Sequence, residues 1–193
     1  MAKAAVAPAG ARAGQGVDWP LALFVALGAA LATYAPAACD STGACGQWAG
    51  TKPYKQFEEF FAFYMTQHAD QTCRRLHFVG TSLVVANVMF DVNAGISILA
   101  ASLFGLATMA ATRSLSSGLV EAGVYIAVLF AVNYRLTKSI RKPLAMLFLG
   151  YGFAWVGHFV FEKNRPATFV YPVYSLASDV RLWAEIVSRS RPF

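Results

Sequence analysis

The three histidines of the sequence fall into two groups that together have the composition of a metal site. His68 and His77 are nine positions apart, and the string His158-Phe-Val-Phe-Glu162 places an imidazole and a carboxylate at i and i+4. On a helix, that spacing puts both side chains on one face. Two or three imidazoles with a carboxylate suit iron, zinc or copper, and two histidines with one carboxylate form the non-haem ferrous pattern used for oxygen chemistry. The alternative is that these are polar residues at the level of the lipid headgroups.

The composition indicates that lipid is the main solvent of this chain. Of 193 residues, 57% are apolar and only 13% are charged, about half the charged fraction that is usual in soluble domains. The net charge of +6 would suggest a nucleic-acid surface in a soluble protein. Here the basic residues lie in short loops between apolar runs, which is how membrane topology is set. We therefore expect no nucleic acid as a partner.

Apolar runs and amphipathic segments predict the helices that must position the histidines. The segment 55–68 has an aromatic stripe opposite Glu58 and Glu59 and is typical of an interfacial helix lying on the membrane. After the Tyr171-Pro172 pair, a capped amphipathic helix is expected to start near Ser175 or Ser178. The first apolar run is also compatible with a signal peptide. Five apolar runs of spanning character lie at residues 19–38, 76–90, 94–111, 119–134 and 144–161.

Counting crossings predicts that the histidines converge. His68 and His77 lie at the start of the 76–90 run, and His158 lies at the end of the 144–161 run. Four crossings separate these points, and an even number returns the chain to the same face of the membrane. That face carries ten lysines and arginines against six on the other, which favours the cytoplasmic side.

The cysteines leave two questions open. Cys39 and Cys45 could form a small disulfide in an oxidising compartment, although the charge count places their loop on the reducing side. Cys73 stands between two histidines and is either a further ligand or a small buried apolar residue.

Two strings of the sequence resemble a known family. FYMTQHADQTCRRLHFVGT and, much later, GYGFAWVGHFVFEKNRPATFVYPVYSLASDV are similar to the small membrane proteins that include the yeast 2-hydroxy fatty acid dioxygenase, a family formerly known as a domain of unknown function. The resemblance covers about residues 57–183. The fungal enzymes carry a further histidine between these blocks, whereas residues 89–145 of this chain contain none.

The resemblance implies an activity and a set of site residues. The family is expected to use Fe(II) and molecular oxygen to shorten 2-hydroxy fatty acids by one carbon, the alpha-oxidation step in phytosphingosine breakdown. By position, His68, His77 and His158 match the metal ligands, and Glu162 matches the motif glutamate as the catalytic residue, either a ligand or an orienting group. Nearby cations are expected to pair with the substrate carboxylate or, alternatively, to anchor the chain at the membrane surface: Arg74, Arg75, Lys163 and Arg165. A structural role is expected for three further residues, namely Asn164 and Pro166 in the turn after the last span and Asp179 in the first turn of a helix.

Together these features predict an all-α integral membrane protein with about five transmembrane helices plus interfacial amphipathic helices. Residues 1–17 form a disordered or partner-bound tail, residues 18–54 an extra first transmembrane helix and loop, and residues 55–193 a four-span dioxygenase-like domain with a C-terminal amphipathic segment. The expected function is a membrane-bound Fe(II)-dependent dioxygenase in contact with membrane lipid. The alternative is a non-catalytic accessory subunit of a larger membrane complex, with partner subunits. The family resemblance implies the endoplasmic reticulum, and the alternative location is the mitochondrial inner membrane.

Overall fold

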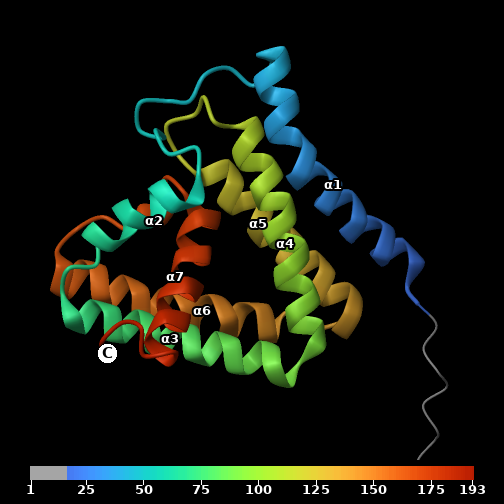
Figure 1. Ribbon diagram of the computed structural model, residues 1–193. Helices are drawn as coiled ribbons and strands as arrows, with labels where there is room; N and C mark the ends of the chain where they lie inside the picture. Colours follow the sequence, from blue (N-terminus) through green and yellow to red (C-terminus); the bar gives the residue numbers. More distant parts are fainter. Residues whose placement is uncertain (1–16) are drawn as a thin grey trace, which may run out of the picture.

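The computed structural model describes residues 17–193, which form helices joined by short loops and contain no strand in that range (Figure 1). The tail predicted at residues 1–17 lies, except for Val17, outside the described residues. The elements are α1 (Trp19–Thr42), α2 (Phe57–Thr66), α3 (Gln71–Phe90), α4 (Val92–Ala111), α5 (Leu119–Thr137), α6 (Arg141–Val156), the π-helix η1 (Gly157–Glu162), the 3-10 helix η2 (Ala167–Phe169) and α7 (Pro172–Val187).

Four of these helices are long and apolar enough to cross a membrane, which confirms the prediction of an all-α membrane protein. They are α1, α4, α5 and the continuous segment Arg141–Glu162 that joins α6 to η1. The sequence predicts about five membrane-spanning helices. The predicted span that is not among these four is the 76–90 run, which lies in α3. This helix begins at Gln71, five residues before its apolar run, and includes Arg74 and Arg75.

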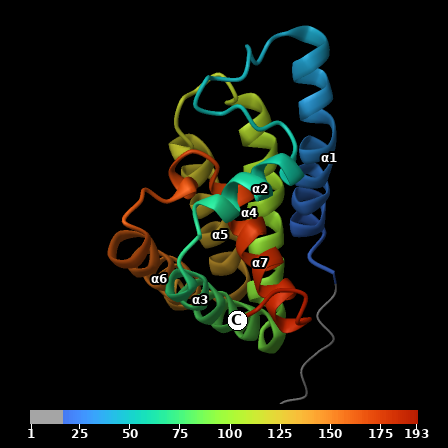
Figure 2. The same ribbon diagram turned by 60° about the vertical axis from the view of Figure 1, so that its left-hand side comes forward.

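The helices form two groups that cross each other (Figures 1 and 2). In one group α4 packs between α1 and α5, and in the other α3 packs along α6, with α7 touching helices of both groups. The α3–α6 pair depends on Gly80, because a Cβ atom there would lie 2.9 Å from the Leu149 carbonyl oxygen. Glycine therefore allows the close approach of the two helices that carry His77 and His158.

The amphipathic helix α2 lies on the protein itself, which corrects the prediction that its aromatic stripe faces the membrane. Phe60, Phe61 and Tyr64 are buried. They form one cluster with Tyr171, which precedes α7, and with Leu182 of α7. The apolar face of α7 supplies a larger and more specific partner for these rings than the headgroup region does.

Helix α7 also begins earlier than predicted. Pro172 is its first residue, a position where the missing N–H costs nothing and the fixed φ favours the helix. The predicted starts at Ser175 and Ser178 are therefore wrong. Asp179 lies two turns inside the helix and not in its first turn, so its carboxylate is available for tertiary contacts.

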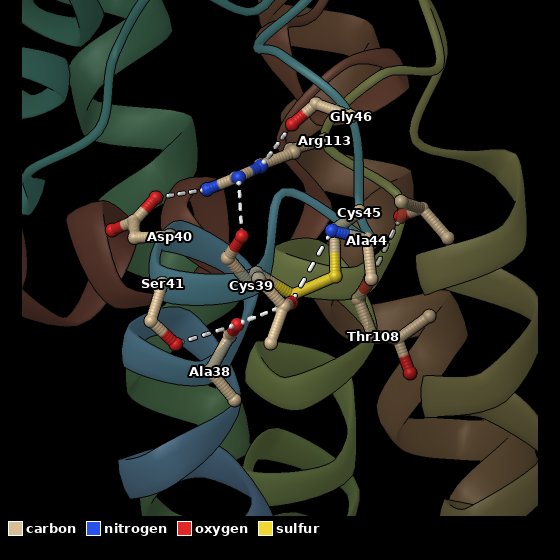
Figure 3. Close-up of a disulfide and its surroundings, with 11 residues drawn as sticks. Ala38, Cys39, Asp40, Ser41, Ala44, Cys45, Gly46, Thr108 and Arg113 are labelled. Carbon is tan, nitrogen blue, oxygen red and sulfur yellow. Dashed lines mark hydrogen bonds and ion pairs between the residues drawn. A yellow bond between two sulfur atoms is a disulfide. The ribbon is translucent and has the colours of Figure 1, made fainter.

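The loop after α1 is held by a disulfide and by one arginine (Figure 3). Cys39 and Cys45 are bonded to each other. Arg113, just after α4, donates to the carbonyl oxygens of Cys39 at 3.0 Å and Gly46 at 2.8 Å, and it pairs with Asp40. Because disulfides persist in oxidising compartments, this pairing favours the opposite orientation to the one that the basic residues suggest.

A buried ion pair fixes the next part of the same loop. Lys52 and Glu121 are both fully buried and bonded to each other, and Thr112 donates a longer hydrogen bond of 3.4 Å to the same carboxylate. The pair joins the loop to α5 beside the α4–α5 turn. Removing one partner of such a pair leaves an uncompensated charge in a medium that solvates it poorly.

We predict that Lys52→Met lowers the free energy of unfolding by about 3–5 kcal/mol. The double variant Lys52→Met/Glu121→Leu should recover much of this loss, since no unpaired charge remains buried. Denaturation of the purified proteins in one detergent, arranged as a double-mutant cycle, measures both values. Equal destabilisation of the single and double variants would contradict the prediction.

Candidate metal centre

Three different elements deliver the histidines to one point. His68 lies in the loop between α2 and α3, His77 lies in the second turn of α3, and His158 is the second residue of η1. All three side chains are buried. Their ring centroids are 4.5 Å apart for His68 and His77, 4.6 Å for His68 and His158, and 5.1 Å for His77 and His158. The predicted convergence is thus observed, although α3, which the crossing count included, is not among the four helices of spanning character.

The Nδ1 atom of each histidine has a hydrogen-bond acceptor within reach. His68 Nδ1 lies 2.7 Å from the carbonyl oxygen of Tyr64, and His77 Nδ1 lies 2.6 Å from Asp179 Oδ1. His158 Nδ1 lies 2.7 Å from Asn164 Oδ1. The Asn164 amide is oriented by its own donor group, because Nδ2 donates to the carbonyl oxygen of Gln67 at 2.9 Å.

These contacts fix the tautomers. A carbonyl oxygen or a carboxylate only accepts, so each Nδ1 carries the proton and each Nε2 presents a lone pair. The Nε2 atoms of His68 and His77 are buried and have no hydrogen-bond partner. A buried polar atom without a partner is costly and calls for an explanation. A bound cation would satisfy these lone pairs.

The spacing of the donor atoms fits one ion. One donor atom each from His68, Cys73, His77 and His158 lie within 4.8 Å of one another, close to the separation that two bonds of about 2 Å allow. The three imidazoles suit iron, zinc or copper. Cys73 Sγ has a second role, because it packs against Gly157, where a Cβ atom would lie 2.9 Å from the sulfur.

The π-helical turn explains how His158 points into the cluster. Residues Gly157–Glu162 are wound more widely than the α-helix before them, and Lys163 ends the turn in the left-handed conformation with φ 55°. Such turns are rare and are often found at functional sites. The reversal at Lys163 brings Asn164 back to the ring of His158, six residues earlier.

Glu162 lies outside this group of donor atoms, so of its two expected roles, ligand or orienting group, the contacts favour the second. Its Oε1 accepts a hydrogen bond of 2.6 Å from the backbone N–H of Asp70. Asp70 in turn caps α3 by accepting from Thr72 and Cys73. Glu162 is therefore a positioning residue that holds the loop of His68 against the end of η1.

The four cations expected to bind substrate do not lie together. Arg74 donates to the carbonyl oxygens of His68 and Ala69 at 2.8 and 2.6 Å, so it supports the His68 loop. Arg75 lies over the ring of Phe193, Arg165 lies over the ring of Phe169, and Lys163 is exposed at the end of η1. Arg165 directly precedes Pro166, which lines the cavity next to the histidines.

The sequence does not reveal the groups that hold the rings in place. Asp179 is expected there to complement a helix dipole, yet it accepts from both His77 and Tyr64. Asn164 is expected to shape the turn after the last span, and it does donate to the Gln67 carbonyl oxygen, but its contact with His158 is not predicted. The sequence feature that could have indicated these two residues is the second motif string, which contains both Asn164 and Asp179.

Burial and close neighbours shift the pKa values of three groups around the centre. Burial and the neighbouring His77 lower the pKa of His68 to about 3. Burial and the adjacent Asp179 raise the pKa of Tyr64 well above its ordinary value, so its hydroxyl remains a donor. Burial opposes ionisation of Asp179, but the electrostatic attraction of His77 and the hydrogen bonds from His77 and Tyr64 outweigh it, so the pKa of Asp179 lies below its usual range.

Fold and site together define a helical membrane protein with a buried three-histidine centre of the kind that binds a transition metal. A family model described as 2-hydroxy-palmitic acid dioxygenase Mpo1-like matches residues 54–191, and the chain belongs to this family. Comparison with curated proteins and with solved structures finds no match. The matched region includes every residue of the candidate centre, whereas α1 and the disulfide loop precede it.

We predict that acid destabilises the metal-free protein through His68. Its pKa of about 3 in the folded state lies below the unfolded value of about 6.5, so the unfolded chain binds the extra proton between these values. This contribution to stability is complete above pH 6.5 and decreases by up to about 1.4 kcal/mol per pH unit below it. Denaturation between pH 7.5 and about 4.5, compared with His68→Gln, measures it. An identical pH dependence in both proteins would contradict the assignment.

We predict that Asp179→Asn weakens metal binding by about 10–100-fold, the usual cost of removing a partner of a ligating histidine. The asparagine has nearly the same shape but lacks the charge that orients His77 and raises its basicity. Competition with a coloured chelator measures the affinity. Glu185→Gln, in the same helix but paired with Arg181 and Arg191, is the matched control and should bind metal as the unchanged protein does.

Proposed function

We propose that this protein is a membrane-bound, Fe(II)-dependent dioxygenase that carries out the alpha-oxidation of 2-hydroxy fatty acids. The observation that supports this most is the set of three buried imidazoles whose Nδ1 atoms are committed to Tyr64, Asp179 and Asn164. A centre built only for packing would not require buried ring nitrogens that lack partners. The family description names 2-hydroxy-palmitic acid, which suggests the substrate class.

His68, His77 and His158 would hold the iron, which supplies the redox chemistry that activates molecular oxygen. The protein's own groups set the conditions for it. Asp179 accepts a hydrogen bond from Nδ1–H of His77 and so keeps that proton in place. The Tyr64 hydroxyl donates a hydrogen bond to the same carboxylate. The three rings are therefore oriented before any ligand arrives, so little free energy is spent on rearrangement.

The substrate carboxylate requires a cation near the histidines. Of the four expected residues, Arg74 is committed to the His68 loop, whereas Arg165 directly precedes Pro166, which lines the adjoining cavity. We propose Arg165 as the carboxylate partner and the exposed Arg75 and Lys163 as surface anchors near lipid headgroups. By family resemblance we propose the endoplasmic reticulum or an equivalent membrane with one oxidising face as the location.

The test combines metal content with turnover. The purified protein, reconstituted with Fe(II) without oxygen, should retain iron and then consume 2-hydroxypalmitate only when oxygen is admitted, yielding a product one carbon shorter. His158→Ala should lose most of the iron and at least about 100-fold in turnover, since it removes one of three ligands. Cys73→Ala, a change at a buried neighbour in the same cluster, should retain iron.

Two outcomes would contradict the proposal. Unchanged protein that neither retains iron nor consumes the acid would favour the accessory-subunit alternative. Iron retained by His158→Ala as tightly as by unchanged protein would place the metal elsewhere. Loss of iron from Cys73→Ala would make the thiol a fourth ligand and revise the donor set, while leaving the reaction class to the turnover assay.

A further inference from the structure

A small cavity adjoins the histidines and leads away from them. It has a volume of about 80 Å³, with His77, His158 and Asp179 at its polar end. The remaining lining comes mainly from apolar side chains of α5, α6 and α7, including Leu129, Met146 and Leu176. One side of the metal centre is thus a short, nearly apolar passage.

A larger groove continues this passage between α5 and α6. It has a volume of about 490 Å³, within the usual range for sites that hold an organic ligand. The two helices diverge from their connection near Ser139 (Figures 1 and 2), and η2 closes the wide end, where Gly118 N–H donates to the Phe169 carbonyl oxygen at 2.8 Å. Five residues line both spaces, which therefore lie directly beside each other: Ala122, Leu147, Tyr151, Trp155 and Thr168.

The outer end of the groove faces lipid. Both α5 and α6 have the length and composition of membrane spans. Apolar side chains that line the groove are also exposed, among them Leu119 at 67% and Phe148 at 70%. An apolar surface of this kind on a spanning helix contacts the acyl region of a bilayer. The two spaces together therefore extend from the lipid to His77 and His158, and their lining changes from apolar to polar along the way.

We propose that the α5–α6 groove holds the alkyl chain of a long-chain 2-hydroxy acid, which enters sideways from the bilayer with its polar end at the histidines. This inference rests on the proposed function and adds the site of the chain. The position of the groove directly beside the histidine cavity selects this occupant over a passively bound lipid, because a groove for a structural lipid has no need to lie against a metal centre. The single change from apolar to polar lining matches a molecule with one polar end.

Gly152 determines how much room the chain has. It lines the groove, and a Cβ atom at this position would meet no other atom within 4 Å. It precedes His158 by six residues, about 9 Å of helix rise. A larger side chain at Gly152 would therefore fill the groove at a distance that a long chain reaches and a short chain does not, without disturbing the backbone or the histidines.

The matched test compares Gly152→Leu with Gly123→Leu. Gly123 is also helical and exposed, and a Cβ atom there would likewise meet nothing within 4 Å, but it lies on α5 away from the groove lining. With protein in lipid nanodiscs and acids compared at equal concentration in the bilayer, the turnover ratio of 2-hydroxypalmitate to 2-hydroxyhexanoate should fall about tenfold or more in Gly152→Leu, because forced overpacking is costly. The ratio should be unchanged in Gly123→Leu. Equal ratios in the two variants would overturn the assignment.

A second measurement does not depend on turnover. A 2-hydroxypalmitate analogue with a diazirine at its chain end should cross-link to residues of α5 and α6, less so in Gly152→Leu, and unlabelled 2-hydroxypalmitate should displace it. Labelling outside these helices, or labelling that 2-hydroxypalmitate does not displace, would overturn the groove assignment in favour of a different site or a structural lipid. Displaceable labelling without turnover in any variant would support the groove and refute the proposed reaction.

Discussion

Each of the three buried imidazoles requires an acceptor for its Nδ1 proton, and the rest of the structure is arranged around this requirement. A polar atom removed from water without a partner costs several kcal/mol in an apolar interior. The three acceptors come from three places, namely the backbone of Tyr64 in α2, the carboxylate of Asp179 in α7 and the amide of Asn164 after η1. Helices α2 and α7 must therefore both lie against the start of α3, although α7 is separated from it by about a hundred residues of chain.

Packing outside the centre holds these acceptors in place. The aromatic rings of α2 are buried against Tyr171 and α7, which fixes the Tyr64 carbonyl beside His68 and its hydroxyl beside Asp179. The contact of Glu162 with the Asp70 N–H closes the loop on the opposite side. These packing contacts and the Glu162 hydrogen bond involve the backbone or residues other than the three histidines. The Nε2 atoms, which face the common centre, are therefore left free to bind a ligand. This arrangement resembles the way proteins orient metal ligands through outer hydrogen bonds.

The sequence predicts the helices because apolar runs indicate them directly. It predicts the convergence of His68, His77 and His158 because the order of these runs can be counted and because the two motif strings indicate the family. It does not predict what the side chains contact. The wider winding of η1 cannot be read from GHFVFE, so the i, i+4 relation of His158 and Glu162 predicts one helical face, whereas the structure sends Glu162 to Asp70. In the same way, the sequence predicts that the last helix starts near Ser175 or Ser178, whereas it starts at Pro172. That error places Asp179 in a first turn and conceals its contact with His77.

The proximity of an apolar groove to a polar centre determines where selectivity can arise. A chain that moves from the bilayer into the α5–α6 groove exchanges one apolar environment for another, so its burial contributes far less than it would from water. Binding free energy that distinguishes a 2-hydroxy acid from the abundant unsubstituted acids must then come from the polar end, where His77, His158 and Asp179 line the cavity. If the proposed reaction is correct, the groove contributes shape rather than affinity and orients the chain so that the carbons beside the carboxylate reach the histidines. Orientation of this kind lowers the barrier of a reaction without strengthening the binding of the substrate itself.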